Sequence, residues 1–192
     1  MPEGRKIVSE RMTNSMDNFE QIKDKALEIG FSHVFEMDAS TIVCRDEVRE
    51  DCARCRAYNT SWACPPACGT IEECQERINK FTHGLLLQTT AELEDQFDVD
   101  SMMQAAADHG KNFAAFSDYI KSVYPGCMLI GTGGCHRCKK CTYPDEPCRF
   151  PDKLTHSMEA NGMVVSDVCT ANDVKYYYGP GTLTYGACVL ID

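Results

Sequence analysis

The chain has 192 residues, and its 19 lysines and arginines against 29 aspartates and glutamates give a formal net charge of −10. No block of basic residues forms a track for phosphate groups, which argues against nucleic acid as a partner. No apolar run approaches the roughly 18 residues that a membrane helix needs, so we expect no membrane span. The polar N-terminus has no apolar stretch of the kind found in secretory signals, which favours a cytoplasmic protein.

Thirteen of the residues are cysteines, an odd and large number for a chain of this length. A disulfide framework is typical of short secreted chains, whereas several cysteines here form C-x-x-C pairs without an export signal. We therefore expect a reducing cytoplasm and thiolates that bind metal. Some of the thirteen are expected to be buried free thiols that act as small hydrophobic side chains.

The first half of the chain is predicted to begin with a mobile segment, residues 1–16, followed by a single cysteine-rich metal-binding domain over 17–192. An apolar stripe at helical spacing predicts a helix over 17–29. Thr70 and Glu73 have the spacing of a capping box at the start of another helix. The other elements expected here are strands over 31–37 and 40–44, a cysteine loop over 44–69 and a buried strand over 83–90.

The second half is predicted to contain one long helix over 101–124, capped by Ser101. Its apolar row includes His109, which we expect to be a hydrogen-bonded core histidine and not a ligand. The elements expected after it are a strand over 127–131, a cysteine loop over 133–151, a helix over 152–161 and strands over 163–168 and 182–192.

The alternation of strands and helices predicts the α/β fold class, with a mixed sheet covered by helices and two cysteine-rich, cluster-binding loops. The order strand, cysteine loop, helix, strand occurs over 41–90 and again over 127–168. This order suggests an internal pseudo-repeat. Both loops follow strands, where ligand sites of such sheets tend to lie.

The second loop reads GGCHRCKKCTYPDEPCRFP and holds Cys135, Cys138, Cys141 and Cys148. A zinc ion usually takes two thiolates from one C-x-x-C pair and two from a distant one. In a cubane each cysteine binds a different iron, so a cysteine at every third residue with a fourth further on indicates a 4Fe–4S cluster. The last gap is six residues here and three in bacterial ferredoxins, so the pattern is ferredoxin-like without being a ferredoxin signature.

The first loop offers Cys52, Cys55 and Cys64 as three ligands of a second 4Fe–4S cluster. Three cysteines compete for the fourth position: Cys68, Cys44 and Cys74. Cys68 is preferred because it lies in the same turn, after the rigid pair Pro65-Pro66. Zinc is the alternative to iron–sulfur clusters at both loops.

Two stretches, CARCRAYNTSWACPPACGTIEEC and GCHRCKKCTYPDEPCRFPDKLTHSMEANGMVV, resemble the predicted metal-binding proteins grouped as domain of unknown function 2284. The resemblance covers about residues 20–190. It implies a cysteine-rich, iron–sulfur type of protein that is frequent in anaerobes, and it implies no reaction. The ligands that the resemblance implies are Cys52, Cys55, Cys64, Cys135, Cys138, Cys141 and Cys148, to which spacing adds Cys68.

These features favour a cytoplasmic iron–sulfur protein with two 4Fe–4S clusters that transfers electrons in anaerobic metabolism. Its acidic balance suits a redox partner with a basic docking patch. One alternative is an enzyme that uses an open iron as a Lewis acid or sulfur carrier. Another is a structural zinc module. No catalytic residue is predicted, because Glu159 and His156 are expected to pack or hydrogen-bond and no matched base or nucleophile stands near them.

Overall fold

The sheet in the computed structural model has five strands, and the structure describes residues 19–192. The segment predicted to be mobile, 1–16, lies outside the described residues. The strands are β1 (His33–Asp38), β2 (His83–Glu92), β3 (Met128–Gly131), β4 (His156–Ser157) and β5 (Thr182–Ile191). They are ordered β1-β2-β5-β3-β4, and only the short pairing of β3 with β4 is parallel. The predicted mixed sheet is therefore confirmed.

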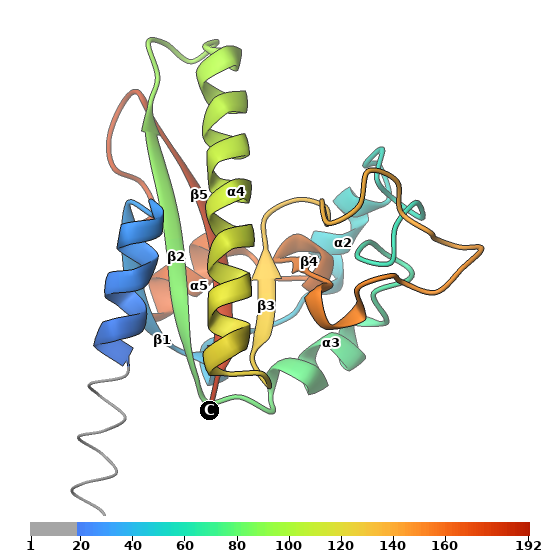
Figure 1. Cartoon of the computed structure of the whole chain (residues 1–192). Coiled ribbons are helices and arrows are strands. Elements are labelled where there is room, and N and C mark those ends of the chain that lie inside the picture. The colour runs from blue at the N-terminus through green and yellow to red at the C-terminus, as the bar shows by residue number, and fades with distance from the viewer. Residues whose placement is uncertain (1–18) are drawn as a thin grey trace, which may run out of the picture.

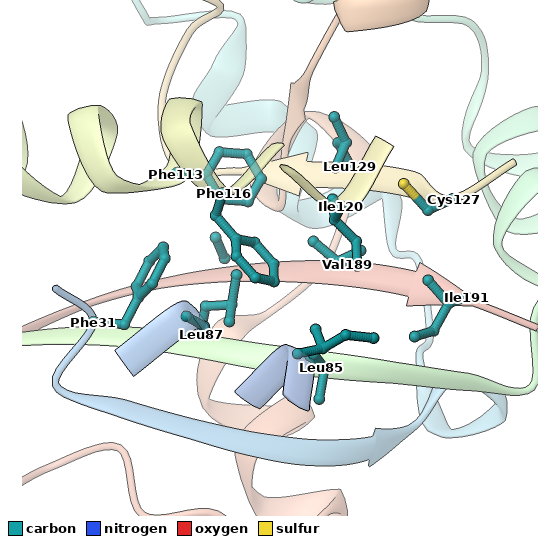
Figure 2. Packing of buried hydrophobic residues seen from close by; sticks show 13 residues of the cluster. Phe31, Leu85, Leu87, Phe113, Phe116, Ile120, Cys127, Leu129, Val189 and Ile191 are labelled. Atoms are coloured by element: carbon teal, nitrogen blue, oxygen red, sulfur yellow. The ribbon is translucent and has the colours of Figure 1, made fainter. Parts of the chain in front are cut away.

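Helices cover both faces of this sheet (Figure 1). A helix over 19–29 and the long α4 (Val99–Val123) pack on one face, with the apolar core shown in Figure 2. The other face is covered by α3 (Ile71–Ile78) and α5 (Val165–Ala171). Successive residues of a strand point to opposite faces, so Leu86 belongs to the second core and its neighbours Leu85 and Leu87 to the first.

Two local predictions from the sequence are confirmed. The Thr70 side chain accepts from the Glu73 N–H and the Glu73 carboxylate accepts from the Thr70 N–H, which is the capping box at the start of α3. His109 is buried, with its Nδ1 2.9 Å from the Thr89 hydroxyl and its Nε2 3.3 Å from the Thr132 hydroxyl. Burial lowers the pKa of His109 to about 4, so this side chain is neutral at pH 7.

Other elements differ from their predictions. The stretch 40–44 is not a strand, because Asp38 caps a short 3₁₀ turn, η1 (Ala39–Thr41). Val165 and the residues after it form α5 instead of a strand. The consecutive residues Val168 and Cys169 both pack into the same core, whereas in a strand they would point to opposite faces. The cap of α4 is Asp98, three residues before the predicted Ser101.

The predicted helix over 152–161 is replaced by three short pieces. They are η2 (Pro151–Lys153), the strand β4 and η3 (Glu159–Asn161). Ser157 pairs with Gly131 in the sheet, and this long-range contact prevents a continuous helix. Gly162 ends η3 in the left-handed conformation, with φ 74°, as a glycine at a helix end commonly does. The order strand, cysteine loop, helix, strand nevertheless occurs twice, as β1, the loop over 44–69, α3 and β2, and as β3, the loop over 133–151, α5 and β5. The short strand β4 is an insertion in the second occurrence, and this order agrees with the suggested pseudo-repeat.

The long α4 is amphipathic, with one buried face and one exposed face. In the described part of the chain, no helix combines the length and the apolar character needed to cross a bilayer.

Candidate metal centre

The two cysteine loops lie side by side at one end of the molecule (Figure 1). Trp62 in the first loop donates its indole N–H to the Glu146 carbonyl in the second loop at 3.1 Å. Tyr143 donates its hydroxyl to Asn59 Oδ1 at 2.5 Å, and its ring meets that of Trp62 edge-on with 4.9 Å between centroids. The loops thus form one cysteine-rich region built from segments about eighty residues apart.

The first loop begins at α2 (Asp46–Cys52) and continues as a series of tight turns. The Cys55 N–H donates to the Cys52 carbonyl at 3.0 Å, and the Cys64 N–H donates to the Ser61 carbonyl at 3.1 Å. These turns place three thiols on the wall of a cavity of about 450 Å³. We call it the thiol cavity; its cysteines are Cys52, Cys55 and Cys64.

The chain at the start of the second loop also lines the thiol cavity, through Thr132, Gly133 and Gly134. A Cβ built on either glycine would meet no atom within 4 Å, so the backbone there faces open space. Close approach of backbone to a bound group is a common reason for glycine at such positions. Cys135 follows directly and is partly buried.

The thiols of the cavity influence one another. Burial raises the pKa of Cys52, and the charges of Glu159 and Cys55 raise it further. Burial also raises the pKa of Cys64, with further increases from Cys55, Cys52 and Cys135. Cys135 of the second loop therefore lies within electrostatic reach of the first loop's thiols. Glu159, at the start of η3, lines the same cavity.

No cysteine of the second loop lines the thiol cavity directly. Burial acts to raise the pKa of Cys141, but hydrogen bonds from the backbone N–H groups of Tyr143 and Trp62 lower it below its usual value. Cys148 lines a separate depression of about 650 Å³ together with Cys68. Cys138 is partly buried. Across residues 19–192, no three side chains of His, Cys, Asp or Glu converge closely enough to hold a single metal ion.

Cys68 and Cys74 occupy a different environment, which we call the arginine-bracketed pair. Arg49 Nη2 donates to Cys68 Sγ at 3.3 Å and to Cys74 Sγ at 3.0 Å. Arg77 Nη2 donates to the same Cys74 sulfur at 3.0 Å and to the Cys68 carbonyl at 2.8 Å. Both thiols are buried, so these guanidinium groups act where few water molecules can compete.

Arg49 also donates hydrogen bonds to two backbone carbonyl groups near this pair. Its Nε and Nη2 donate to the Ala160 carbonyl at 2.9 and 2.6 Å, and its Nη1 donates to the Gly69 carbonyl at 2.6 Å. Cys44 lies nearby, where burial and the charge of Cys74 raise its pKa to about 11 against the opposing effect of Arg49 and Arg77. All three cysteines considered for the fourth position of the first loop therefore gather around the two arginines.

The two arginines were missed by reasoning from the sequence. Arg77 follows Cys74 by three residues, which places both on one face of a helix, so helical spacing could have indicated this contact. Arg49 precedes Cys52 on α2 and reaches Cys74 over 25 residues, for which the sequence has no comparable signal.

His156 lies beside the arginines on the short strand β4. Burial lowers its pKa to about 4, with the charges of Arg77 and Arg49 acting in the same direction. It lines the depression that contains Cys68 and Cys148.

The fold and the cysteine region together define a cysteine-rich α/β protein whose loops enclose a thiol-lined cavity. A family model described as "Predicted metal-binding protein (DUF2284)" matches residues 35–191, and the chain therefore belongs to this family. The match includes both cysteine loops and confirms the resemblance drawn from the sequence. A search of curated proteins found no match, and neither did a search of solved structures.

Proposed function

We propose that this protein is a cytoplasmic iron–sulfur protein that holds two 4Fe–4S clusters on its cysteine loops and transfers electrons in anaerobic metabolism. The observation that carries the proposal is the thiol cavity of about 450 Å³, which three cysteines and two glycines with open space beside them line together. That volume suits a polynuclear cluster, whose cysteine ligands each bind a different iron. The residues present therefore fit such a cluster.

The chain's own residues have separate roles in this proposal. Cys52, Cys55 and Cys64 bind iron as thiolates, while Gly133 and Gly134 admit the bound group close to the backbone. Cys135, Cys138, Cys141 and Cys148 are the expected ligands of a second cluster, and Cys68 is the fourth ligand that spacing adds to the first. When bound, a 4Fe–4S cluster supplies a one-electron redox centre whose potential depends on nearby charge and hydrogen bonds.

The position of the cysteines suits electron transfer to another protein. Cys55 is exposed and Cys52 is partly so, which places a cluster in the thiol cavity close to the surface. The formal charge of −10 favours a partner with a basic docking patch, since opposite charge speeds encounter and fixes orientation.

Anaerobic preparation of the full chain tests the proposal. We expect about eight iron and eight acid-labile sulfide per chain, and reversible one-electron reduction followed by electron paramagnetic resonance. The matched control is Cys188→Ala, which removes a fully buried thiol from β5 and should leave the iron content unchanged. Zinc without iron or sulfide in the anaerobic protein would favour the structural zinc module, and clusters that never reduce would refute electron transfer.

A further inference from the structure

Three thiols line the thiol cavity, whereas a fully coordinated 4Fe–4S cluster takes four. Within the first loop the remaining candidates are Cys44, Cys68 and Cys74, and none of them lines the cavity. Both Cys68 and Cys74 accept hydrogen bonds from Arg49. Cys68 Sγ in turn donates to the Ala160 carbonyl at 3.6 Å.

Ala160 separates these candidates from the cavity. It lines the thiol cavity, and its carbonyl oxygen accepts from Arg49 on the side of the arginine-bracketed pair. Cys68 would therefore have to leave Arg49 and pass Ala160 to reach a cluster beside Cys52. A thiol of the second loop has a shorter path, because the residues directly before Cys135 already line the cavity.

Cys135 is positioned for that approach. The cavity wall formed by Thr132, Gly133 and Gly134 ends one residue before it. Thr132 donates its hydroxyl to the Gly186 carbonyl on β5 and contacts His109 Nε2, so the start of this wall is fixed to the sheet. The next two residues are glycines with open space beside them, so the backbone before Cys135 is not confined by side chains. Cys135 itself lines a smaller cavity of about 80 Å³ beside α4, which shares Gly133 and Gly134 with the thiol cavity. Its charge contributes to the raised pKa of Cys64, so the two thiols are near enough to interact.

We infer that Cys135 of the second loop is the fourth thiol ligand of the cluster held by Cys52, Cys55 and Cys64. The inference rests on the proposed function and specifies its ligands. The two loops then share a cluster, and the C-x2-C-x2-C run divides after its first cysteine. One metal–sulfur group would join segments that otherwise meet through side-chain contacts such as Trp62 with Glu146.

Double substitutions in the full chain test this ligand assignment by iron and sulfide content after anaerobic preparation. Cys52→Ser and Cys135→Ser should each lose about half of the iron, and the double variant should lose no more than either alone, because both thiols serve one cluster. Cys52→Ser with Cys141→Ser is the matched control and should lose nearly all the iron. Nearly complete loss in the Cys52→Ser, Cys135→Ser variant would overturn the inference.

A second set of variants tests the assignment of Cys135 even if each single substitution releases all the iron. Replacing Cys138, Cys141 and Cys148 together by serine should leave one cluster, with about four irons per chain. Adding Cys135→Ser to this triple variant should remove the remaining cluster, whereas adding Cys68→Ser should leave it in place. The reverse pattern, or no iron in the triple variant, would refute the assignment to Cys135. Absence of iron and sulfide from the wild-type protein would refute the proposed function itself.

Discussion

The thiol cavity and the arginine-bracketed pair place cysteines of the same loop in contrasting surroundings. Cys74 receives hydrogen bonds from two guanidinium groups, each at 3.0 Å, and Cys68 receives one. In the cavity, the sulfur of Cys55 accepts a weaker bond from the Ala57 N–H at 3.4 Å. Burial raises the pKa of both Cys52 and Cys68, so the contrast lies in the hydrogen-bond donors. One group of sulfurs has strong hydrogen-bond donors within the protein, whereas the other lacks them and is the group that we propose to bind metal.

The largest expected effect comes from removing metal. Stripping the anaerobic protein with a chelator should accelerate amide hydrogen exchange throughout 44–69 and 133–151 and lower the melting temperature. Metal binding and folding are coupled, and these loops contain little regular structure to hold them without it. Amides of β2 and β5 should keep their protection. Unchanged exchange in both loops after chelation would contradict the contrast between the two groups of thiols.

Arg49→Ala should destabilise the arginine-bracketed side by about 4 kcal/mol. The Gly69 carbonyl and the buried Cys68 sulfur lose their arginine donor, and the Ala160 carbonyl keeps only the weak contact from Cys68 Sγ. Each unsatisfied buried acceptor costs about 1–3 kcal/mol. Denaturant unfolding of the wild type and the variant measures the difference. Arg45→Ala is the matched control, because its ion pair with Asp167 is about half exposed and should contribute about 1 kcal/mol or less. Equal effects of the two substitutions would show that Arg49 has no special role.

Acid should destabilise the sheet independently of either group of thiols. His109 has its pKa lowered from 6.5 to about 4 by burial, so the unfolded chain binds its proton more readily. Its contribution is fully present above pH 6.5 and is lost as the pH falls toward 4, at a cost of up to about 3 kcal/mol.

The measurement compares the pH dependence of unfolding free energy for the wild type and His109→Gln. The variant should show the shallower loss between pH 6.5 and 4, while His156, with a similarly lowered pKa, titrates in both proteins. Parallel curves would mean that His109 is not the source of the acid sensitivity.

The smallest effect is expected at the contact between the loops. Tyr143→Phe removes the hydroxyl that donates to Asn59 and should cost about 1 kcal/mol or less, since the pair is exposed. If Cys135 joins the loops through a shared cluster, Tyr143→Phe should increase amide hydrogen exchange in the two loops of the metal-free protein. The metal-loaded protein should show no such increase. The same small increase in both forms would argue against a shared cluster.

The sequence predicted those elements whose signals are local. The capping box at Thr70, the buried strand around Leu86 and the core position of His109 all follow from neighbours within a few residues. Contacts over long separations were not predictable: β4 exists because Ser157 pairs with Gly131, and α5 replaces a strand because packing overrides the β preference of its valines.

The candidate site was predictable in composition and not in arrangement. Cysteine spacing and the family resemblance identified the metal-binding loops, and the family match supports that interpretation. Spacing assigned one cluster to each loop because it treats each loop alone. It gave no indication that Arg49 would face Cys74, or that Gly133 and Gly134 would form a wall of the first loop's cavity.

Trp62 is the chain's single tryptophan, and its indole N–H donates to Glu146 at the junction of the two loops. All tryptophan fluorescence of the protein therefore comes from this junction. Excitation at a longer wavelength, which tyrosine does not absorb, separates it from tyrosine emission. An absorbing cluster beside the loops would quench that emission. We therefore expect Trp62 emission to act as an intrinsic optical probe of metal loading and loss in solution, without any label.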